Sequence, residues 1–236
     1  MYGKKAHNKY LRLKTRPMLK AVLFDMDGVI VDTEPLHKKA YFLMFDHFNI
    51  NVSSALYEST TGQSTINVCK RLCDVFGLDN NPEELVQCKR KIFTGLFHSD
   101  PSLKLIDGVL DIIQDYHKNG LTLVLASSAS MQTINNVFTR FDLDQYFVAK
   151  ISGADLKASK PHPEIFEKAA GLAGHPQAHC IVIEDSTNGI KAAKSAGSYC
   201  IGFDSFHSKN QDYTLADHVV NTFNDIPFKT ITALLS

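Results

Sequence analysis

The sequence lacks a long hydrophobic run, and this absence excludes a membrane-spanning helix. The chain has 236 residues, and none of its apolar stretches approaches the length of about 20 residues that such a helix needs. No apolar segment follows the basic residues near the start, so we do not expect a secretory signal peptide. Internal repeats and low-complexity tracts are also absent, which leaves an ordinary globular chain.

The sequence also lacks a net charge of either sign. Its 25 Lys and Arg residues balance 25 Asp and Glu residues, so the electrostatic field of the whole protein favours neither nucleic acid nor a membrane as partner. We also expect a monomer. The first twenty residues differ, because they hold seven basic residues and no acidic one. Residues 1–19 are predicted to be a flexible, solvated leader, and a polyanion-binding arm is the alternative.

A disulfide framework is not indicated either. Five cysteines, an odd number, occur without a signal peptide, and this combination is typical of a reducing cytoplasm. Cys69 and Cys73 lie four residues apart and would share one helix face. We interpret them as helix-core thiols, because no further Cys or His lies nearby at ligand spacing; a metal or redox pair is the alternative.

Short apolar runs alternate with helical patterns over most of the chain. Strands are predicted at residues 20–27, 121–128, 147–152, 180–185, 199–203 and 217–220. The helical patterns between them lie at residues 108–119, 129–140, 163–173 and 186–197. This alternation predicts an α/β fold, with a doubly wound, parallel, Rossmann-like sheet and helices on both of its faces.

Helical patterns alone follow the first predicted strand. A helix is expected to begin at Thr33 as its cap, with Pro35 in its first turn, and further helices are expected at residues 66–76 and 82–97. Residues 20–34 and 103–236 are therefore predicted to form the core, and residues 35–102 an inserted, all-helical cap domain. Two segments would cross between them and make a natural hinge.

Polar residues follow four of the apolar runs. In open α/β sheets, ligands bind beyond the carboxyl ends of the strands, so these residues should meet. They are Asp25, Asp27, Ser127, Ser128, Lys160, Glu184 and Asp185. Carboxylates suit Mg²⁺, one of them can attack phosphorus, and hydroxyl and ammonium groups can neutralise a phosphoryl group. Each residue alone fits a turn, a helix cap or a solvated surface, so the prediction depends on their combination.

The order of these segments resembles the haloacid dehalogenase superfamily. Residues 24–33 (FDMDGVIVDT) resemble its first motif, residues 125–128 its second, Lys160-Pro161 its third and residues 183–186 its fourth. The resemblance implies that Asp25 is the nucleophile and a Mg²⁺ ligand. It implies that Asp27 is the general acid/base and a metal ligand through its carbonyl group.

The other motif residues receive roles by the same resemblance. Ser127, Ser128 and Lys160 would hold the phosphoryl group. Asp185 would be a third metal ligand, with Glu184 in or just outside that shell. An Asp at position 27 favours phosphate-ester or phosphomutase chemistry over the dehalogenase and phosphonatase branches.

Within the superfamily the chain is most similar to β-phosphoglucomutase and related sugar phosphatases. The resemblance places Thr33 and His37 at the hinge, where the histidine of the mutase helps to orient the acid/base. It assigns substrate contacts to a cap loop comprising Thr61, Gly62, Gln63, Ser64 and Thr65. Thr61 and Thr65 stand where the mutase has a lysine and an arginine for a second phosphate, which needs charged donors.

The resemblance therefore favours a phosphatase over a mutase. The expected substrate is a small sugar or polyol phosphate, because threonine, serine and glutamine suit hydroxyl groups. A β-phosphoglucomutase-type activity is the alternative. A non-catalytic binding protein on this scaffold is the third interpretation, although Asp25, Asp27, Lys160 and Asp185 are all present.

Overall fold

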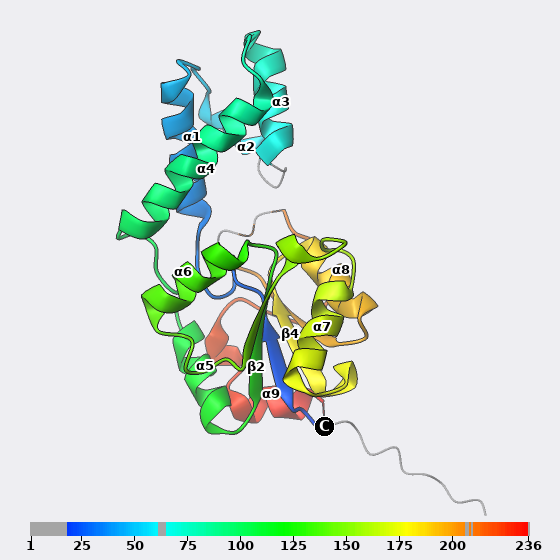
Figure 1. Cartoon of the computed structure of the whole chain (residues 1–236). Coiled ribbons are helices and arrows are strands. Elements are labelled where there is room, and N and C mark those ends of the chain that lie inside the picture. The colour runs from blue at the N-terminus through cyan, green and yellow to red at the C-terminus, as the bar shows by residue number, and fades with distance from the viewer. Residues whose placement is uncertain (1–17, 61–64, 206–207, 209, 236) are drawn as a thin grey trace, which may run out of the picture.

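The computed structural model describes residues 18–60, 65–205, 208 and 210–235. It shows an α/β part with a helical unit standing beyond one end of its sheet (Figure 1). The strands are β1 (Ala21–Phe24), β2 (Thr122–Ser127), β3 (Ala149–Ser152), β4 (Cys180–Glu184), β5 (Tyr199–Phe203) and β6 (His218–Val220). The helices of the α/β part are α5 (Val109–Lys118), α6 (Met131–Phe141), α7 (Glu164–Ala173), α8 (Thr187–Ser195) and α9 (Phe228–Leu234).

The six described strands form one parallel sheet in the order β3-β2-β1-β4-β5-β6. All six lie within the segments predicted as strands, and the doubly wound fold class is confirmed. Strand order reverses around β1, because β2 pairs with one of its edges and β4 with the other. Such a reversal opens a crevice at the carboxyl ends of the two strands, which is the usual place for a ligand.

Successive side chains of β1 point to opposite faces of the sheet, and each face is covered by a layer of helices. Val22 and Phe24 face one hydrophobic cluster, which packs against α5, α6 and α9. Ala21 and Leu23 face the other, which packs against α7 and α8. Strands buried on both faces read as continuous apolar runs, as predicted for a parallel sheet. Leu19, at the end of the predicted leader, is also buried in the first cluster.

The described residues of the helical unit form four helices with a hydrophobic core of their own. They are α1 (Glu34–His47), α2 (Ser54–Glu58), α3 (Thr65–Phe76) and α4 (Pro82–Ser99). The short helix α2 was not predicted; it is capped by Ser53, whose hydroxyl accepts a hydrogen bond from the N–H of Leu56. Cys69 and Cys73 are buried free thiols in this core, as expected for helix-core residues.

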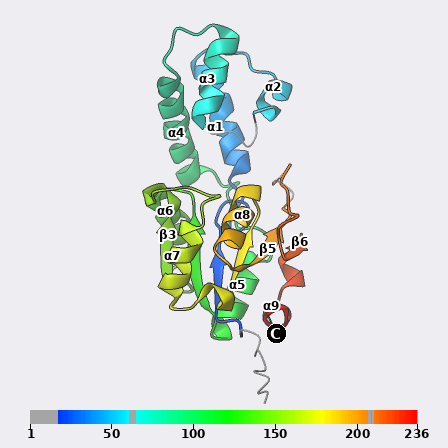
Figure 2. The same cartoon turned by 90° about the vertical axis from the view of Figure 1, so that its right-hand side faces the viewer.

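Two connecting segments join the helical unit to the sheet, and they touch each other (Figures 1 and 2). The first comprises residues 25–33 and the second residues 100–108. Val31 forms an antiparallel bridge with Leu105, and the N–H of Ile106 donates to the carbonyl of Ile30 at 3.0 Å. Among the helices that the structure describes, none is long and apolar enough to cross a membrane.

Candidate active site

The carboxyl ends of the central strands surround a cavity of about 280 Å³ below the helical unit. Six carboxylates and one lysine line it, so its described lining is strongly acidic. The lining residues are Asp25, Asp27, Gly28, Asp32, Thr33, Glu34, Ser127, Ser128, Lys160, Glu184, Asp185, Ser186, Ser208 and Gln211. All seven strand-end residues singled out from the sequence are among them.

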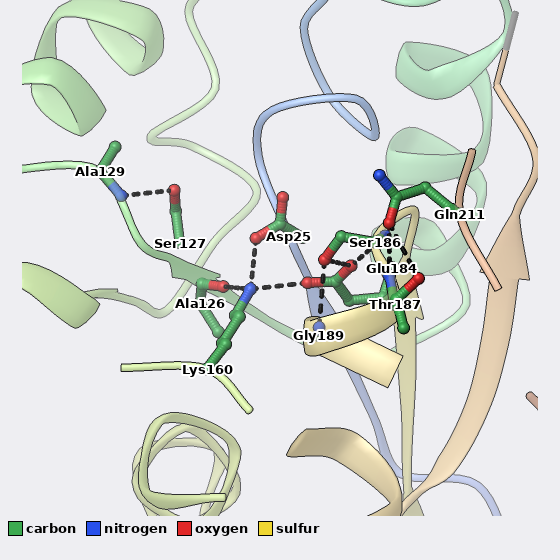
Figure 3. A network of polar contacts seen from close by, with 10 residues as sticks. All are labelled: Asp25, Ala126, Ser127, Ala129, Lys160, Glu184, Ser186, Thr187, Gly189 and Gln211. Carbon is green, nitrogen blue, oxygen red and sulfur yellow. Dashed lines mark hydrogen bonds and ion pairs between the residues drawn. The ribbon is translucent and has the colours of Figure 1, made fainter. Parts of the chain in front are cut away.

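Asp25 and Lys160 form the centre of this cavity (Figure 3). Asp25 directly follows β1, and its Oδ1 lies 2.5 Å from the Lys160 ammonium. The same ammonium donates to Glu184 Oε1 at 2.8 Å and to the carbonyl of Ala126 at 3.1 Å. Burial alone would lower the pKa of Lys160, but Asp25 and Glu184 outweigh it and raise this pKa. Lys160 therefore remains a cation beside Asp25.

Glu184 holds Lys160 and the start of α8 together. Its Oε2 accepts hydrogen bonds from the N–H and the hydroxyl of Ser186, at 2.7 and 2.9 Å. Gly189 leaves room for this carboxylate, since a Cβ there would lie 1.7 Å from Glu184 Oε1. Both oxygens of Glu184 are thus engaged within the protein.

Asp27 lies within the first connecting segment and is held by Thr33. The Thr33 hydroxyl donates to Asp27 Oδ1 at 2.5 Å. The expectation that the Thr33 side chain caps α1 is therefore wrong: its hydroxyl is committed to Asp27, and its backbone is αR rather than the extended form usual at a cap. Burial raises the pKa of Asp27, although the bond from Thr33 opposes this shift.

Asp185 follows β4 and packs against the backbone of Gly28. Gly28 has φ +82°, and a Cβ there would lie 2.0 Å from Asp185 Oδ2, so this turn requires glycine. Ser208 donates a short hydrogen bond to the same oxygen. Burial and the nearby Glu184 raise the pKa of Asp185 to about 7.

Ser127 ends β2 and Ser128 follows it, and both line the cavity. Ser127 Oγ accepts from the N–H of Ala129 at 3.1 Å, and its own proton remains available (Figure 3). Ser128 is exposed to the cavity. Donors at these positions can reach an anion bound next to Asp25.

The three residues expected to bind the metal each offer one oxygen atom to a cation. Asp25 Oδ2, Asp185 Oδ1 and the carbonyl oxygen of Asp27 accept no hydrogen bond from the described residues, whereas Glu184 has no free oxygen. Two carboxylates and one carbonyl are suitable ligands for Mg²⁺, which keeps several waters. The described residues contain no cluster of three or more His, Cys, Asp or Glu side chains fit for a metal.

Burial and like charges also act on Asp25 in the absence of a cation. Burial raises the pKa of Asp25 well above its usual value; Lys160 opposes this effect, and Glu184 and Asp185 add to it. A divalent cation would reverse that balance, because it favours the ionised carboxylate. The donor set therefore fits Mg²⁺.

The helical unit contains a buried lysine that the sequence did not single out. Lys89 of α4 is 4% exposed, and its Nζ lies 2.7 Å from Nδ1 of His37. It lies 4.9 Å from the ring centroids of Tyr41 and Phe93, and His37 stacks on Phe93. Burial, with the Lys89 charge, lowers the pKa of His37 to about 3, so this ring stays neutral and accepts from Lys89.

The residues predicted at the hinge and in the cap loop are only partly brought to the cavity. Thr33 lines it, whereas His37 contacts Lys89, and Thr65, at the start of α3, bonds to Tyr41. Thr61, Gly62, Gln63 and Ser64 lie outside the described residues. Two lining residues, Ser208 and Gln211, come from the loop after β5. They were not predicted from the sequence, because they lie outside its motifs.

Comparisons with known proteins find similar sequences and a similar structure. The sequence profile of the family described as haloacid dehalogenase-like hydrolase matches residues 22–203. Hexitol phosphatase B of Escherichia coli (strain K12) is 27% identical over 220 residues, covering 93% of this chain and 99% of the relative. The phosphorylated carbohydrates phosphatase of Thermotoga maritima is 29% identical over 183 residues, covering 76% and 82%. The structure of β-phosphoglucomutase from Clostridium difficile is similar with a TM-score of 0.71 at 26% identity, covering 92% and 97%.

Proposed function

The chain belongs to the haloacid dehalogenase-like hydrolase family, and on that premise we propose that it hydrolyses small phosphate monoesters with the help of Mg²⁺. The observation that carries this proposal is Asp25, buried at the end of β1 and ion-paired with Lys160 in a cavity with five other carboxylates. Asp25, Asp185 and the carbonyl of Asp27 would hold the Mg²⁺. When bound, this ion neutralises charge on the phosphate and on the attacking carboxylate.

The first step transfers the phosphoryl group to Asp25. An oxygen of the Asp25 carboxylate attacks phosphorus, and the bond from phosphorus to the leaving oxygen breaks. Asp27 donates its proton to that oxygen, a role that suits its raised pKa and its position beside Thr33. Lys160, Ser127 and Ser128 offset the charge of the transferring group.

The second step returns the phosphoryl group to water. Asp27, now ionised, takes a proton from water, whose oxygen attacks phosphorus. The bond between phosphorus and Asp25 breaks, which gives inorganic phosphate and restores both carboxyl groups. Glu184 keeps Lys160 in place through both steps, because its two oxygens hold Lys160 and Ser186.

We propose a sugar or polyol phosphate as the substrate. Relatives named for hexitol and carbohydrate phosphates support this choice. The helical unit stands beyond one end of the sheet (Figure 2) and would act as the cap. The five free cysteines fit a reducing cytoplasm, and we propose a monomer without nucleic-acid or membrane partners.

A screen of phosphate esters with Mg²⁺ tests this function. We expect phosphate release from hexitol and sugar phosphates, and none from the Asp25→Asn variant, whose amide is not a nucleophile. Chelation of Mg²⁺ should abolish the release, and its restoration should return it. Equal release by wild type and Asp25→Asn would refute the assignment.

A phosphomutase is the second candidate, because the chain is also similar to β-phosphoglucomutase. In that case Asp25 would pass its phosphoryl group to a second sugar hydroxyl instead of to water. Conversion of β-glucose 1-phosphate to glucose 6-phosphate with a bisphosphate activator, without phosphate release, would favour the mutase. We expect phosphate release to dominate, because the described cavity lining offers no arginine for a second phosphate.

A further inference from the structure

The loop between β5 and β6 folds over the carboxyl end of β4 and supplies two residues to the cavity, Ser208 and Gln211. Tyr213 anchors this loop: its hydroxyl lies 3.0 Å from the carbonyl oxygen of Asp185 and 3.3 Å from that of Phe203. Ser208 donates to Asp185. Gln211 lies between these two anchors in the sequence and lines the cavity.

The orientation of the Gln211 amide follows from its partner, Thr187 at the start of α8. The backbone N–H of Thr187 lies 2.8 Å from Gln211 Oε1 and can only donate, so the atom facing it must be the amide oxygen. The Thr187 hydroxyl accepts from the N–H of Asp212 at 2.7 Å and directs its own proton to the same oxygen at 3.0 Å. The NH₂ group of Gln211 therefore points away from Thr187, as Figure 3 shows.

This NH₂ group makes no hydrogen bond with the residues that the structure describes. Most other side-chain donors around the cavity are committed to carboxylates: Lys160 to Asp25 and Glu184, Thr33 to Asp27, Ser186 to Glu184 and Ser208 to Asp185. The hydroxyl protons of Ser127 and Ser128 remain, and in the view of Figure 3 Asp25 lies between Ser127 and Gln211. Gln211 is thus an uncommitted donor on the side opposite the proposed phosphate-binding serines.

We infer that Gln211 is a specificity-determining residue that donates its amide N–H to a hydroxyl oxygen of the substrate's leaving group. This inference rests on the proposed phosphatase function and narrows its substrate class to polyhydroxylated phosphate esters. An uncharged amide suits a hydroxyl group better than a second phosphate, which needs charged donors. The amide oxygen of Gln211 is held by two donors, so it serves neither as a metal ligand nor as an acceptor for substrate.

The variant Gln211→Glu separates substrate recognition from loop anchoring. Its carboxylate keeps an acceptor for Thr187 but has no N–H to donate. Sorbitol phosphate and hexyl phosphate form the matched pair of esters, because they share a six-carbon chain and differ in its hydroxyl groups. The added negative charge acts on both phosphates alike and cancels in the ratio of their kcat/KM values.

We expect Gln211→Glu to lower the kcat/KM ratio of sorbitol phosphate to hexyl phosphate by about three- to tenfold, the value of one net hydrogen bond to an uncharged group. Gln211→Ala should lower this ratio by a similar factor. The control Tyr213→Phe removes a loop anchor but keeps the amide and its two hydrogen bonds from Thr187, so it should change both kcat/KM values together and leave the ratio intact.

An unchanged ratio in Gln211→Glu and Gln211→Ala, with wild type hydrolysing both esters, would overturn the inference and leave the phosphatase function standing. Hydrolysis of hexyl phosphate in preference to sorbitol phosphate by wild type would overturn it as well. Absence of phosphate release from every ester in the screen would refute the proposed function itself, and the inference with it.

Discussion

Replacing His37 with asparagine removes a titrating ring from the helical unit but keeps a hydrogen-bond acceptor near the position of Nδ1. In the wild type this nitrogen faces the Lys89 ammonium at 2.7 Å, and the ring stacks on Phe93 with centroids 4.2 Å apart. Protonation of His37 would place two cations in contact in a buried site. Asparagine still accepts from Lys89 and does not titrate.

The magnitude follows from the pKa of His37, which burial and Lys89 lower from 6.5 to about 3. Below pH 6.5 the unfolded chain binds a proton at this residue and the folded chain does not, so the folded state loses stability as pH falls. The loss continues until the pH reaches the folded pKa near 3. At about 1.4 kcal/mol per pH unit, the wild type should lose about 2 kcal/mol through this group at pH 5.

Urea unfolding of wild type and His37→Asn at several pH values between 5 and 8 measures this effect. Above pH 6.5 the difference in the free energy of unfolding should be constant and should reflect the lost ring stacking. Toward pH 5 it should shift by about 2 kcal/mol in favour of the variant, while the acidic residues titrate alike in both proteins. A difference that stays constant from pH 8 to pH 5 would refute the conclusion that His37 is buried and neutral.

Three further predictions concern the site and its connections. Asp27→Asn should lower kcat for alkyl phosphates by about 10²- to 10⁴-fold but affect p-nitrophenyl phosphate less, because that leaving group needs no proton; equal losses would contradict the acid role. Gly28→Ala, which forces a Cβ against Asp185, should weaken Mg²⁺ binding in calorimetry, and unchanged affinity would contradict the packing. Arg140 donates three hydrogen bonds, of 2.7, 2.8 and 3.2 Å, to carbonyl groups at residues 97, 100 and 103. Arg140→Ala removes them, so amide hydrogen exchange in this segment should become faster while exchange in β1 stays the same. Unchanged exchange in the segment would contradict the interpretation that Arg140 holds it in place.

The features predictable from the sequence are those encoded in short contiguous segments. Each strand was recognisable as an apolar run, and the polar residue that ends it could be placed at one sheet edge by the general rule for parallel sheets. The elements missed are short. The helices α2 and α9 have 5 and 7 residues, which is too few for a helical periodicity to stand out.

The contacts that were missed depend on tertiary structure. Lys89 reads as a solvated helix residue, and its burial arises only because His37, Tyr41 and Phe93 surround it. Gln211 is 24 residues away from Thr187 in sequence, so no local pattern pairs them. Thr33 has the sequence of a helix cap, but the folded chain offers its hydroxyl a nearby carboxylate instead.

The central claim is that Asp25 becomes phosphorylated, and mass spectrometry after rapid acid quenching tests it most directly. The Asp27→Asn variant, mixed with Mg²⁺ and p-nitrophenyl phosphate, should accumulate the intermediate, because its leaving group departs without a proton while activation of water is impaired. The peptide that contains Asp25 should gain the mass of one phosphoryl group, and the gain should disappear when Asp25 is also replaced by asparagine. Turnover of the ester with no phosphorylated peptide, or with the phosphoryl group on another residue, would contradict the mechanism.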